Sequence, residues 1–524
     1  MSIPSTRRRG TRLRWIAVTA VVTVAALALA ACGGSSSSKP SSINSSDIVQ
    51  NATITVGLPE AIPTLDPQKR EFYGIAAIDD WNIFEALLKR DASGQLQPWL
   101  ASALPKQLNP TTWQFKLRSG ITFTNGEPFD AQSAAFSINR IIQPKYASEM
   151  LSRVNTIKKA VAVDKDTLNV VTTSPDPILP SRIELIMMIP AKAGQSASFG
   201  QHPVGTGPYV WKSGIGNGPI QIAANPNYWN SDVPKPTITT VNFKVIPDVS
   251  TEISALQAGE IDLLMRLGAD QAKAVPQLLT APGLDSNVVT LNSTSGITSD
   301  VRVRQALNYA IDKDALAKQL WSGYADVSKC QPIASSAFGY DDSLSPYSYD
   351  PTKAKALLKA AGAEGSTIDL YTADGVFPQG KQMGQVIAQY WEDAGLKVNL
   401  QVPSFDDYLK ALYAKGPKRP GGVYLSTTTE LQDADSVIQR IFVSSADIAG
   451  YNNSKVDKLA KQESSELDAT KRKAEIAQLL STTCSDAAAV YLLTPQDLYG
   501  ATKRLVFKPR SDEKVMFADM SVTK

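Results

Sequence analysis

Apolar and polar positions recur with two different periods along this chain, which predicts strands interleaved with helices. Residues 53–57 alternate at the strand period of two. Residues 112–118 do so again, before a Ser-Gly turn and a further short strand at 121–124. Residues 76–89 carry apolar side chains at helical spacing, so a helix is expected there. Asp130 is the expected N-cap of another helix, which runs through residue 142.

The same interleaving continues toward the C-terminus. Strands alternating with helices favour layered α/β domains over a β-sandwich or a helix bundle. No internal repeat is visible in the sequence. The pattern predicts strands at residues 166–172, 241–246 and 395–402, and helices at residues 251–258, 301–312, 315–320, 351–361, 381–394, 406–414 and 453–480.

Residues 1–31 have the composition of a secretory signal peptide. Five arginines precede an uncharged apolar run at residues 15–28, and small residues follow it. Cys32 comes directly after Leu-Ala-Ala, which resembles the bacterial lipobox, whose cysteine is diacylated with chains such as palmitate. The other interpretation is an ordinary signal peptide with a chance cysteine. We expect an exported protein held by lipid on Cys32 at the outer face of the membrane, because two acyl chains suffice for stable anchoring.

The remaining composition sets the size and charge of the folded part. Residues 32–50 form a Gly/Ser-rich tether that is expected to be disordered. The roughly 470 residues that follow are too many for one core and predict two or three domains. Loss of residues 1–31 would take the net charge from +3 to −2. A nearly neutral surface gives no electrostatic reason to expect nucleic acid as a partner.

The sequence lacks the residues that several kinds of catalytic or metal site require. His202 is the single histidine, which argues against a His-rich metal site, and no G-x-S-x-G nucleophile elbow occurs. The loop at 375–381 approaches a phosphate-binding loop, but Gln382 stands where Ser or Thr would bind magnesium. We therefore expect no catalytic site, no metal and no cofactor. Besides Cys32, only Cys330 and Cys484 remain, which leaves open one disulfide or two free thiols.

Seven short phrases occur in order between residues 64 and 312. Each alone is weak, but together they resemble bacterial solute-binding protein family 5, the dipeptide- and oligopeptide-binding lipoproteins of ABC importers. The resemblance runs from about residue 51 to the C-terminus. The phrases are TLDP (64–67), NIFEALL (82–88), WQFKLRSGITFTNGEPFDA (113–131), PVGTGPY (203–209), NPNYW (225–229), ALQAGEID (255–262) and VRVRQALNYAID (301–312).

The resemblance implies an α/β, two-lobed periplasmic-binding-protein-like fold of type II. Such a fold has an extra subdomain on the first lobe and a cleft that closes on ligand by hinge motion. The expected boundaries are 51–290 for the first lobe, 97–205 for its extra subdomain, 291–494 for the second lobe, and 495–524 for a return to the first. The recognisable phrases are expected to shape turns and the core, with Tyr228 and Trp229 packed inside. They identify the scaffold rather than the ligand site.

Peptide-binding members of this family hold the free amine of the ligand with an acidic residue of the second lobe. Counting back from Asp433 places Glu430 at that position, with Thr427 where the family has tryptophan. Thr427 and Thr428 would replace apolar cover with hydroxyls, which suits a polar ligand. Alternatively, Glu430 is a solvated rim residue and Asp433 or Asp435 is the anchor. The resemblance adds further cleft candidates, whose aromatic members could equally be core residues: Glu71, Tyr73, Tyr146, Gln379 and Phe405.

The function implied is that of an extracytoplasmic, monomeric substrate-binding protein. It would bind a small polar solute, a short peptide by this reading, without changing it chemically. Its partners would be two ABC permease subunits in the membrane and their ATPases. The alternatives are the same fold binding an oligosaccharide, glutathione, haem or a metal chelate, and a non-transport role in the cell envelope. The single histidine disfavours direct nickel ligation.

Overall fold

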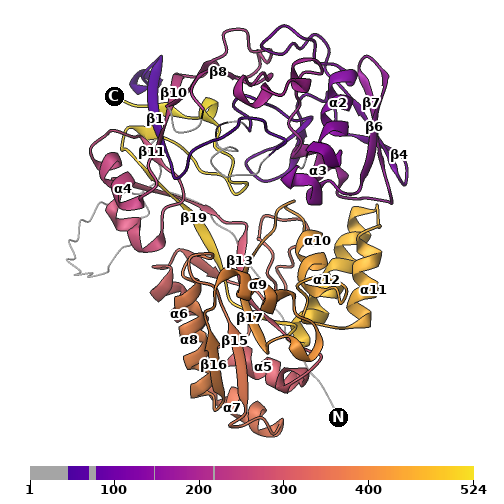
Figure 1. Cartoon of the computed structure of the whole chain (residues 1–524), viewed down its shortest axis with the longest axis vertical. Coiled ribbons are helices and arrows are strands. Elements are labelled where there is room, and N and C mark those ends of the chain that lie inside the picture. Colours follow the sequence, from indigo (N-terminus) through magenta and orange to yellow (C-terminus); the bar gives the residue numbers. More distant parts are fainter. Residues whose placement is uncertain (1–44, 70–77, 79, 147, 216–218) are drawn as a thin grey trace, which may run out of the picture. The chain divides into compact units, whose positions relative to one another are not determined.

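Two large β-sheets and a smaller one organise the computed structural model, which describes residues 45–69, 78, 80–146, 148–215 and 219–524 (Figure 1). The chain from Ser46 to Lys524 forms one unit, and every statement below concerns that unit. We call the part built on the eight-stranded sheet the first lobe and the part built on the five-stranded sheet the second lobe. The domain boundaries expected from the sequence stay predictions.

The sheet of the first lobe is mixed. β1 (Ala52–Leu58) pairs in parallel with β10 (Ile238–Val245), and both lie where the sequence predicts strands, at residues 53–57 and 241–246. Alternate residues of β1, including Ile54 and Val56, are buried in the core of this lobe. Helix α4 (Val249–Gln257) follows β10. The other strands of the sheet are β8 (Tyr209–Ser213), β9 (Ile220–Ala224), β11 (Leu263–Leu264), β12 (Gln277–Pro282), β14 (Ala325–Val327) and β19 (Leu493–Ala501).

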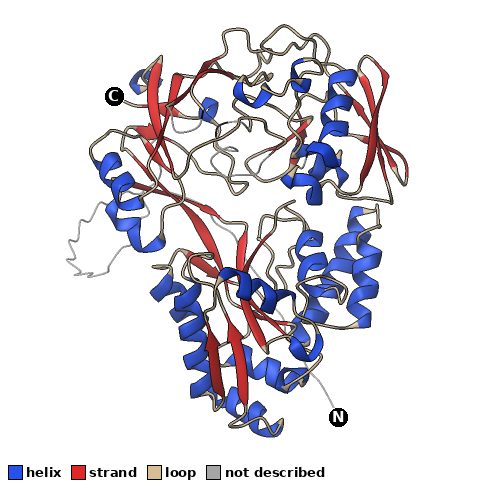
Figure 2. Ribbon diagram, in the orientation of Figure 1, coloured by secondary structure: helices blue, strands red, loops and turns tan. Residues whose placement is uncertain are grey.

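The sheet of the second lobe has the order β16-β15-β17-β13-β18, and helices cover both of its faces (Figure 2). Because side chains alternate along β13, Val289 packs into one core and Val288 into the other. The strands are β13 (Asp285–Leu291), β15 (Thr367–Tyr371), β16 (Lys397–Gln401), β17 (Gly422–Thr428) and β18 (Ala489–Tyr491). The helices are α5 (Val301–Tyr309), α6 (Lys313–Leu320), α7 (Pro351–Ala360), α8 (Gly380–Asp393), α9 (Phe405–Tyr413), α10 (Ala434–Val437), α11 (Ser454–Glu463) and α12 (Ala469–Ser485).

A four-stranded antiparallel sheet with the order β4-β5-β7-β6 belongs to the first lobe. Helix α2 (Ala131–Ile141) packs against it. As predicted, Asp130 caps this helix, and Ser133 returns a hydrogen bond to complete a capping box. The strands are β4 (Lys106–Asn109), β5 (Thr112–Lys116), β6 (Ile157–Asp164) and β7 (Thr167–Thr172); nearby lie helix α3 (Leu179–Glu184) and the hairpin of β2 (Leu88–Arg90) and β3 (Leu96–Pro98).

The carboxylate of Glu85 joins three of the recognisable phrases. Glu85 is 1% exposed and accepts four hydrogen bonds of 2.6–2.8 Å, two on each oxygen. Its donors are the indole of Trp99, the hydroxyls of Thr206 and Tyr228, and the indole of Trp229. Burial raises the pKa of Glu85, while these hydrogen bonds act to lower it. Tyr228 and Trp229, which were expected inside the core, are half-buried and hydrogen-bond to this buried carboxyl group.

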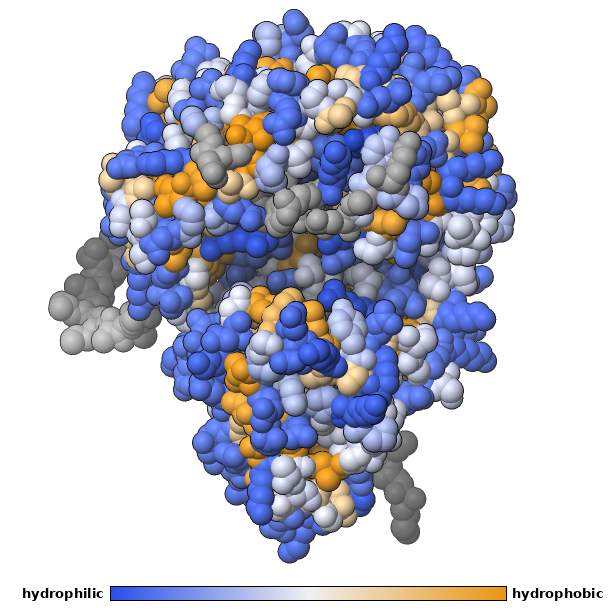
Figure 3. All heavy atoms as spheres, in the orientation of Figure 1, coloured by the Kyte–Doolittle hydropathy of each residue, from blue (hydrophilic) through white to orange (hydrophobic). Residues whose placement is uncertain are grey.

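Strand β19 links the two lobes. Its C-terminal part pairs with β12 of the first lobe, and its start pairs with β14, the strand of the same sheet that follows α6 of the second lobe in the chain. The connection from β12 to β13 is the other crossing segment. A disulfide joins Cys330, in the loop after β14, to Cys484 on α12, with a Cα–Cα distance of 5.4 Å. The surface in Figure 3 is hollowed where the two lobes meet and is predominantly hydrophilic.

The two ends of the described chain lie side by side on the first lobe. Ile48 forms an antiparallel bridge with Thr523, and the amide of Val49 donates to the carbonyl of Val522. Within the C-terminal segment, β20 (Leu505–Val506) pairs with β21 (Ser521–Val522). The segment is held to this lobe because Phe517 packs in its core and Asn82 hydrogen-bonds to the backbone of Val515 and Phe517.

Three expected elements differ from the structure. The predicted helix at 76–89 is wrong over its described part beyond residue 79, where residues 81–83 form a turn and β2 begins at Leu88. Residues 81–88 are all buried, so their apolar spacing did not mark one helical face. The expected strand at 121–124 is only a bridge between Thr122 and Pro128. The single helix expected at 453–480 is divided into α11 and α12, with Asp468 capping the second.

Candidate functional site

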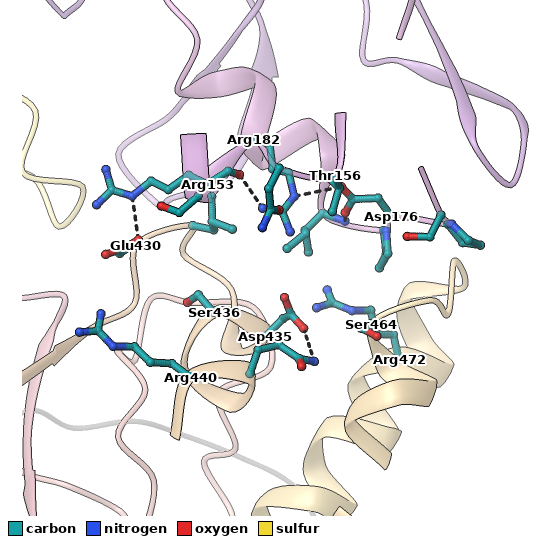
Figure 4. Close-up of a pocket in the computed structure, with 18 residues that line it drawn as sticks. Arg153, Thr156, Asp176, Arg182, Glu430, Asp435, Ser436, Arg440, Ser464 and Arg472 are labelled. Carbon is teal, nitrogen blue, oxygen red and sulfur yellow. Dashed lines mark hydrogen bonds and ion pairs between the residues drawn. The ribbon is translucent and has the colours of Figure 1, made fainter. Parts of the chain in front are cut away.

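A pocket of about 480 Å³ lies between the first and second lobes (Figure 4). One wall comes from residues 152–182 of the first lobe. The other comes from the segment after β17, α10, the turn Ile438–Phe442, Ser464 just after α11, and Arg472 of α12. Its surface is rich in charged, hydroxyl and amide side chains. The lining includes Ser152, Arg153, Asn155, Thr156, Ser174, Asp176, Arg182, Glu430, Asp435, Ser436, Gln439, Arg440, Ser464 and Arg472.

Glu430 and Arg153 face each other across this pocket (Figure 4). Their side chains are 30% and 17% exposed, and Arg153 Nε donates to Glu430 Oε2 at 2.7 Å. Burial acts to raise the pKa of Glu430, but the hydrogen bond and charge of Arg153, with the charge of Arg440, outweigh it and hold that pKa below its ordinary value. Glu430 is therefore a charged acceptor in the pocket, opposed by a cation from the other lobe.

The position of Arg153 is fixed by a second buried pair. Arg182 Nε donates to Asp176 Oδ2 at 2.9 Å, and its Nη1 donates to the carbonyl oxygen of Arg153 at 2.5 Å. Asp176 also accepts from the Thr156 hydroxyl and from the amide of Ile178. The Asp176–Arg182 pair thus holds the end of the short 3₁₀ turn Glu149–Arg153, from which Arg153 reaches toward Glu430.

The other two acidic candidates for the anchor are engaged within the second lobe. Asp433 caps α10 and forms two hydrogen bonds of 2.6–2.7 Å with Arg472. Asp435 accepts from Gln439 at 3.0 Å. Burial, together with the neighbouring charge of Asp435, raises the pKa of Glu463 to about 10, so protonated Glu463 donates a hydrogen bond to Asp435. Among the interactions of the described residues, neither Asp433 nor Asp435 forms an ion pair with the first lobe as Glu430 does.

The remaining predicted site residues lie elsewhere. Thr427 is fully buried on β17, and the Thr428 hydroxyl donates to Asp285. Phe405 is 49% exposed at the start of α9, stacked on Tyr408, and Gln379 precedes α8 in a left-handed conformation. The Tyr146 ring lies under the guanidinium of Arg140, at 4.7 Å from its centroid. Glu71, Tyr73 and Cys32 fall outside the described residues.

Of the predicted residues that the structure describes, Glu430 and the alternative anchor Asp435 line this pocket. Sequence reasoning missed Arg153, Asp176, Arg182 and Arg440. None of them lies in a recognisable phrase, and a lone arginine in a polar segment carries no signal that separates it from a surface residue. Among the described residues, no group of three or more His, Cys, Asp or Glu is placed to hold a metal ion.

Comparison with known proteins assigns the scaffold. The family model for bacterial extracellular solute-binding proteins, family 5, middle region, matches residues 95–446. The chain belongs to this family. The family's proteins bind solutes outside the cytoplasm for ABC importers. No helix among the described residues combines the length and apolar character that a membrane crossing requires.

The names of the relatives of this family 5 chain refer to different solutes. It is 28% identical over 409 residues to haem-binding protein A of Haemophilus influenzae, covering 71% of this chain and 74% of that protein. It is 29% identical over 398 residues to the dipeptide-binding protein of Escherichia coli, covering 68% and 72%. The unliganded open form of the murein tripeptide-binding protein MppA superposes with a TM-score of 0.80 at 20% identity, covering 91% of this chain and 99% of that one. This likeness confirms the predicted type II periplasmic-binding-protein fold.

Proposed function

We propose that this protein captures short peptides with a free amino terminus and delivers them, chemically unchanged, to an ABC permease. We also propose that lipid on Cys32 anchors it outside the membrane and that it acts as a monomer. The observation that carries the peptide proposal is the ionised Glu430, which faces a pocket between the lobes and is opposed there by a guanidinium. An ammonium group of a solute would replace one cation with another at the same carboxylate.

The other charges of the pocket fit a zwitterion. Arg440 is exposed on the turn Ile438–Phe442 and acts electrostatically on Glu430. Once an ammonium group binds Glu430, Arg153 and Arg440 become available to a carboxylate of the same solute. The hydroxyl and amide side chains around them suit peptide groups, which need both donors and acceptors. The named dipeptide-binding relative is consistent with this proposal.

Isothermal titration calorimetry with Ala-Ala-Ala and N-acetyl-Ala-Ala-Ala tests the proposal directly. Glu430→Gln is expected to weaken binding of Ala-Ala-Ala by roughly 10- to 100-fold, the loss typical of a charge-assisted hydrogen bond. Acetylation should weaken binding to the wild type by a similar factor and have little further effect in the variant. Arg153→Gln should weaken binding of Ala-Ala-Ala less than Glu430→Gln does, because it removes the cation that competes for Glu430 together with one partner of the peptide carboxylate.

The control is Glu60→Gln, which removes an exposed carboxylate of the first lobe. Equal affinity of the wild type and Glu430→Gln for Ala-Ala-Ala would refute the role of Glu430. Native mass spectrometry of the purified protein supplies an independent check. A co-purified sugar, haem or metal chelate in place of a peptide would replace the peptide proposal while leaving the fold assignment intact.

A further inference from the structure

A second pocket between the lobes adjoins the one that contains Glu430, which we call the Glu430 pocket. Its volume is about 470 Å³. One wall comes from the β2–β3 hairpin, the loop before β4 and the start of α3, all of the first lobe. The other comes from the loop between β14 and α7, the segment after β17 and the start of α12. Pro177, Ile178 and Arg472 line both pockets, so the two share a wall, and we call the second one the side pocket.

A contact between the lobes marks the boundary of the two pockets. Arg90 of the side pocket is 7% exposed, and its Nη2 donates to the carbonyl oxygen of Leu431 at 3.0 Å. The same guanidinium donates to the carbonyl oxygen of Gly94 at 2.7 Å and to the hydroxyl of Ser181 at 2.9 Å. Leu431 lines the Glu430 pocket and directly follows Glu430 in the chain. A solute bound at Glu430 therefore lies next to the side pocket.

The buried charges of the side pocket are engaged within the protein. Arg472 forms two hydrogen bonds of 2.6–2.7 Å with Asp433 and lies 3.0 Å from Glu463 Oε2. Arg90 lies 3.8 Å from Glu184 Oε2, besides donating its hydrogen bonds. A solute would gain little from these groups, because their present bonds would first have to be broken. The buried part of the pocket therefore offers a solute mainly neutral side chains.

Apolar side chains from both lobes line the side pocket. Leu104 of the first lobe is 54% exposed there. Phe338 of the second lobe is half-buried, and its ring centroid lies 5.0 Å from the guanidinium of Arg472. An apolar side chain of a solute that covered Leu104 would remove water from both surfaces, which is favourable in proportion to the area covered. The other apolar residues of the lining are Leu96, Pro177, Ile178, Pro180, Ala337, Leu467 and Ala469.

Gln432 gives the side pocket an acceptor that lacks a donor. This residue lines the pocket and is 5% exposed, and its Oε1 is buried without a hydrogen-bond partner among the described residues. The oxygen lies against Gly94 of the first lobe, where an added Cβ would be 3.0 Å away and where φ is +82°. Buried acceptors are normally paired. The N–H group of a solute would supply the missing donor.

We propose that the side pocket is a subsite for an apolar side chain of the bound peptide, and that Gln432 Oε1 accepts a hydrogen bond from a backbone N–H of the same peptide. This inference rests on the proposed function and narrows its substrate class to peptides with an apolar second or third residue. Glu430 and Gln432 are two residues apart, a backbone span of at most about 7 Å. Two residues of an extended peptide cover the same span. A peptide with its amine at Glu430 therefore brings its second or third residue to the side pocket.

Three isomeric peptides, Leu-Ala-Ala, Ala-Leu-Ala and Ala-Ala-Leu, test the subsite against Ala-Ala-Ala by isothermal titration calorimetry. The isomers have the same charge and composition, so a difference in affinity between them reports where the leucine lies. We expect Ala-Leu-Ala or Ala-Ala-Leu to bind about tenfold more tightly than Ala-Ala-Ala, the gain from burying about half of a leucine side chain. Leu-Ala-Ala should gain less than about threefold, because its leucine stays beside Glu430.

Leu104→Ser tests the wall of the side pocket, and Leu108→Ser is its matched control. Both leucines are exposed, by 54% and 46%, but Leu108 lies on β4 and lines neither pocket. The preference for the favoured isomer should fall to about threefold in Leu104→Ser and stay near tenfold in Leu108→Ser. Gln432→Met keeps a side chain of similar length without the acceptor, and it should weaken binding of that isomer by about fivefold.

The outcomes separate this subsite from peptide capture itself. Equal affinity of the three isomers, or tightest binding of Leu-Ala-Ala, overturns the subsite and leaves peptide capture intact. A preference that is unchanged in Leu104→Ser, or lost equally in Leu108→Ser, also overturns the subsite, and unchanged affinity in Gln432→Met overturns its hydrogen bond. If no peptide binds, peptide capture fails, and saturation-transfer NMR with N-acetyl-leucinamide decides the subsite alone. Transfer to its methyl groups that is weaker in Leu104→Ser than in the wild type supports the subsite, and equal or absent transfer overturns it.

Discussion

Glu252 provides a test of how burial sets stability in the first lobe. It lies on α4, is 4% exposed, and its Oε1 is buried without a hydrogen-bond partner among the described residues. Its carboxyl group packs directly on Gly57 of β1, where an added Cβ would lie 2.0 Å from Oε1. Desolvation raises the pKa of Glu252 from 4.5 to about 7. The folded protein therefore holds this proton more tightly than the unfolded chain does.

The sign of the pH dependence follows from that difference. The stabilisation by protonated Glu252 is complete below pH 4.5 and is lost as the pH rises through 7. The two pKa values correspond to about 3.4 kcal/mol in all, of which about 2.5 kcal/mol falls between pH 5 and pH 8. Glu252→Gln removes the titration while keeping a neutral side chain of the same size. Its free energy of unfolding should lack this part of the pH dependence.

Urea denaturation of both proteins from pH 5 to pH 8 measures the effect. Subtracting the variant's free energy of unfolding from that of the wild type removes the contributions of Asp497, Glu463 and other shared groups. The difference should fall by about 2.5 kcal/mol over this range. Glu364→Gln, at an exposed position, should give a flat difference curve. A flat curve for Glu252→Gln as well would refute the reasoning.

Two further predictions concern buried junctions. Glu85→Gln should lower the free energy of unfolding by about 2–4 kcal/mol, because the new NH₂ group faces two donors. Urea denaturation checks this, with Glu60→Gln as the exposed control, and a loss below 0.5 kcal/mol, roughly the effect of a surface substitution, would contradict it. Replacing Cys330 and Cys484 by serine opens a bridge between residues 154 apart, for which chain entropy gives about 5 kcal/mol. Dithiothreitol should then destabilise the wild type but not the double variant, and equal sensitivity of the two would count against a formed disulfide.

Sequence patterns were most informative where one side of an element faces solvent. The helix at α2 was predicted together with its cap, because Asp130 precedes a segment whose buried residues recur at helical spacing. The helix predicted over residues 81–88 was wrong for the opposite reason. They are buried on all sides, and Trp81 takes a left-handed conformation with φ of 65° that periodicity does not reveal. Apolar spacing alone cannot separate a fully buried turn and strand from a helix.

The candidate site was likewise predictable from the sequence only in part. Glu430 was located by its offset from Asp433 within a family phrase, and the structure places it in a pocket between the lobes. Its partner Arg153 lies 277 residues earlier in the chain, and only the folded arrangement brings the two together. Contacts of this kind depend on the crossing of the chain between lobes, which local pattern does not encode.

The adjacent chain ends have a mechanical consequence. Ile48 bridges Thr523, so whatever precedes residue 45 and whatever is fused after residue 524 attach to the first lobe at nearly the same point. In the described part of the chain, the backbone passes between the lobes at the crossing segments around β12–β13 and β19, and side-chain contacts such as Arg153–Glu430 add to this connection. A force applied at either terminus therefore acts on the first lobe, and the second lobe is not held directly. A dye at either terminus would mark the stationary partner, and a second dye on α7 would follow the moving one.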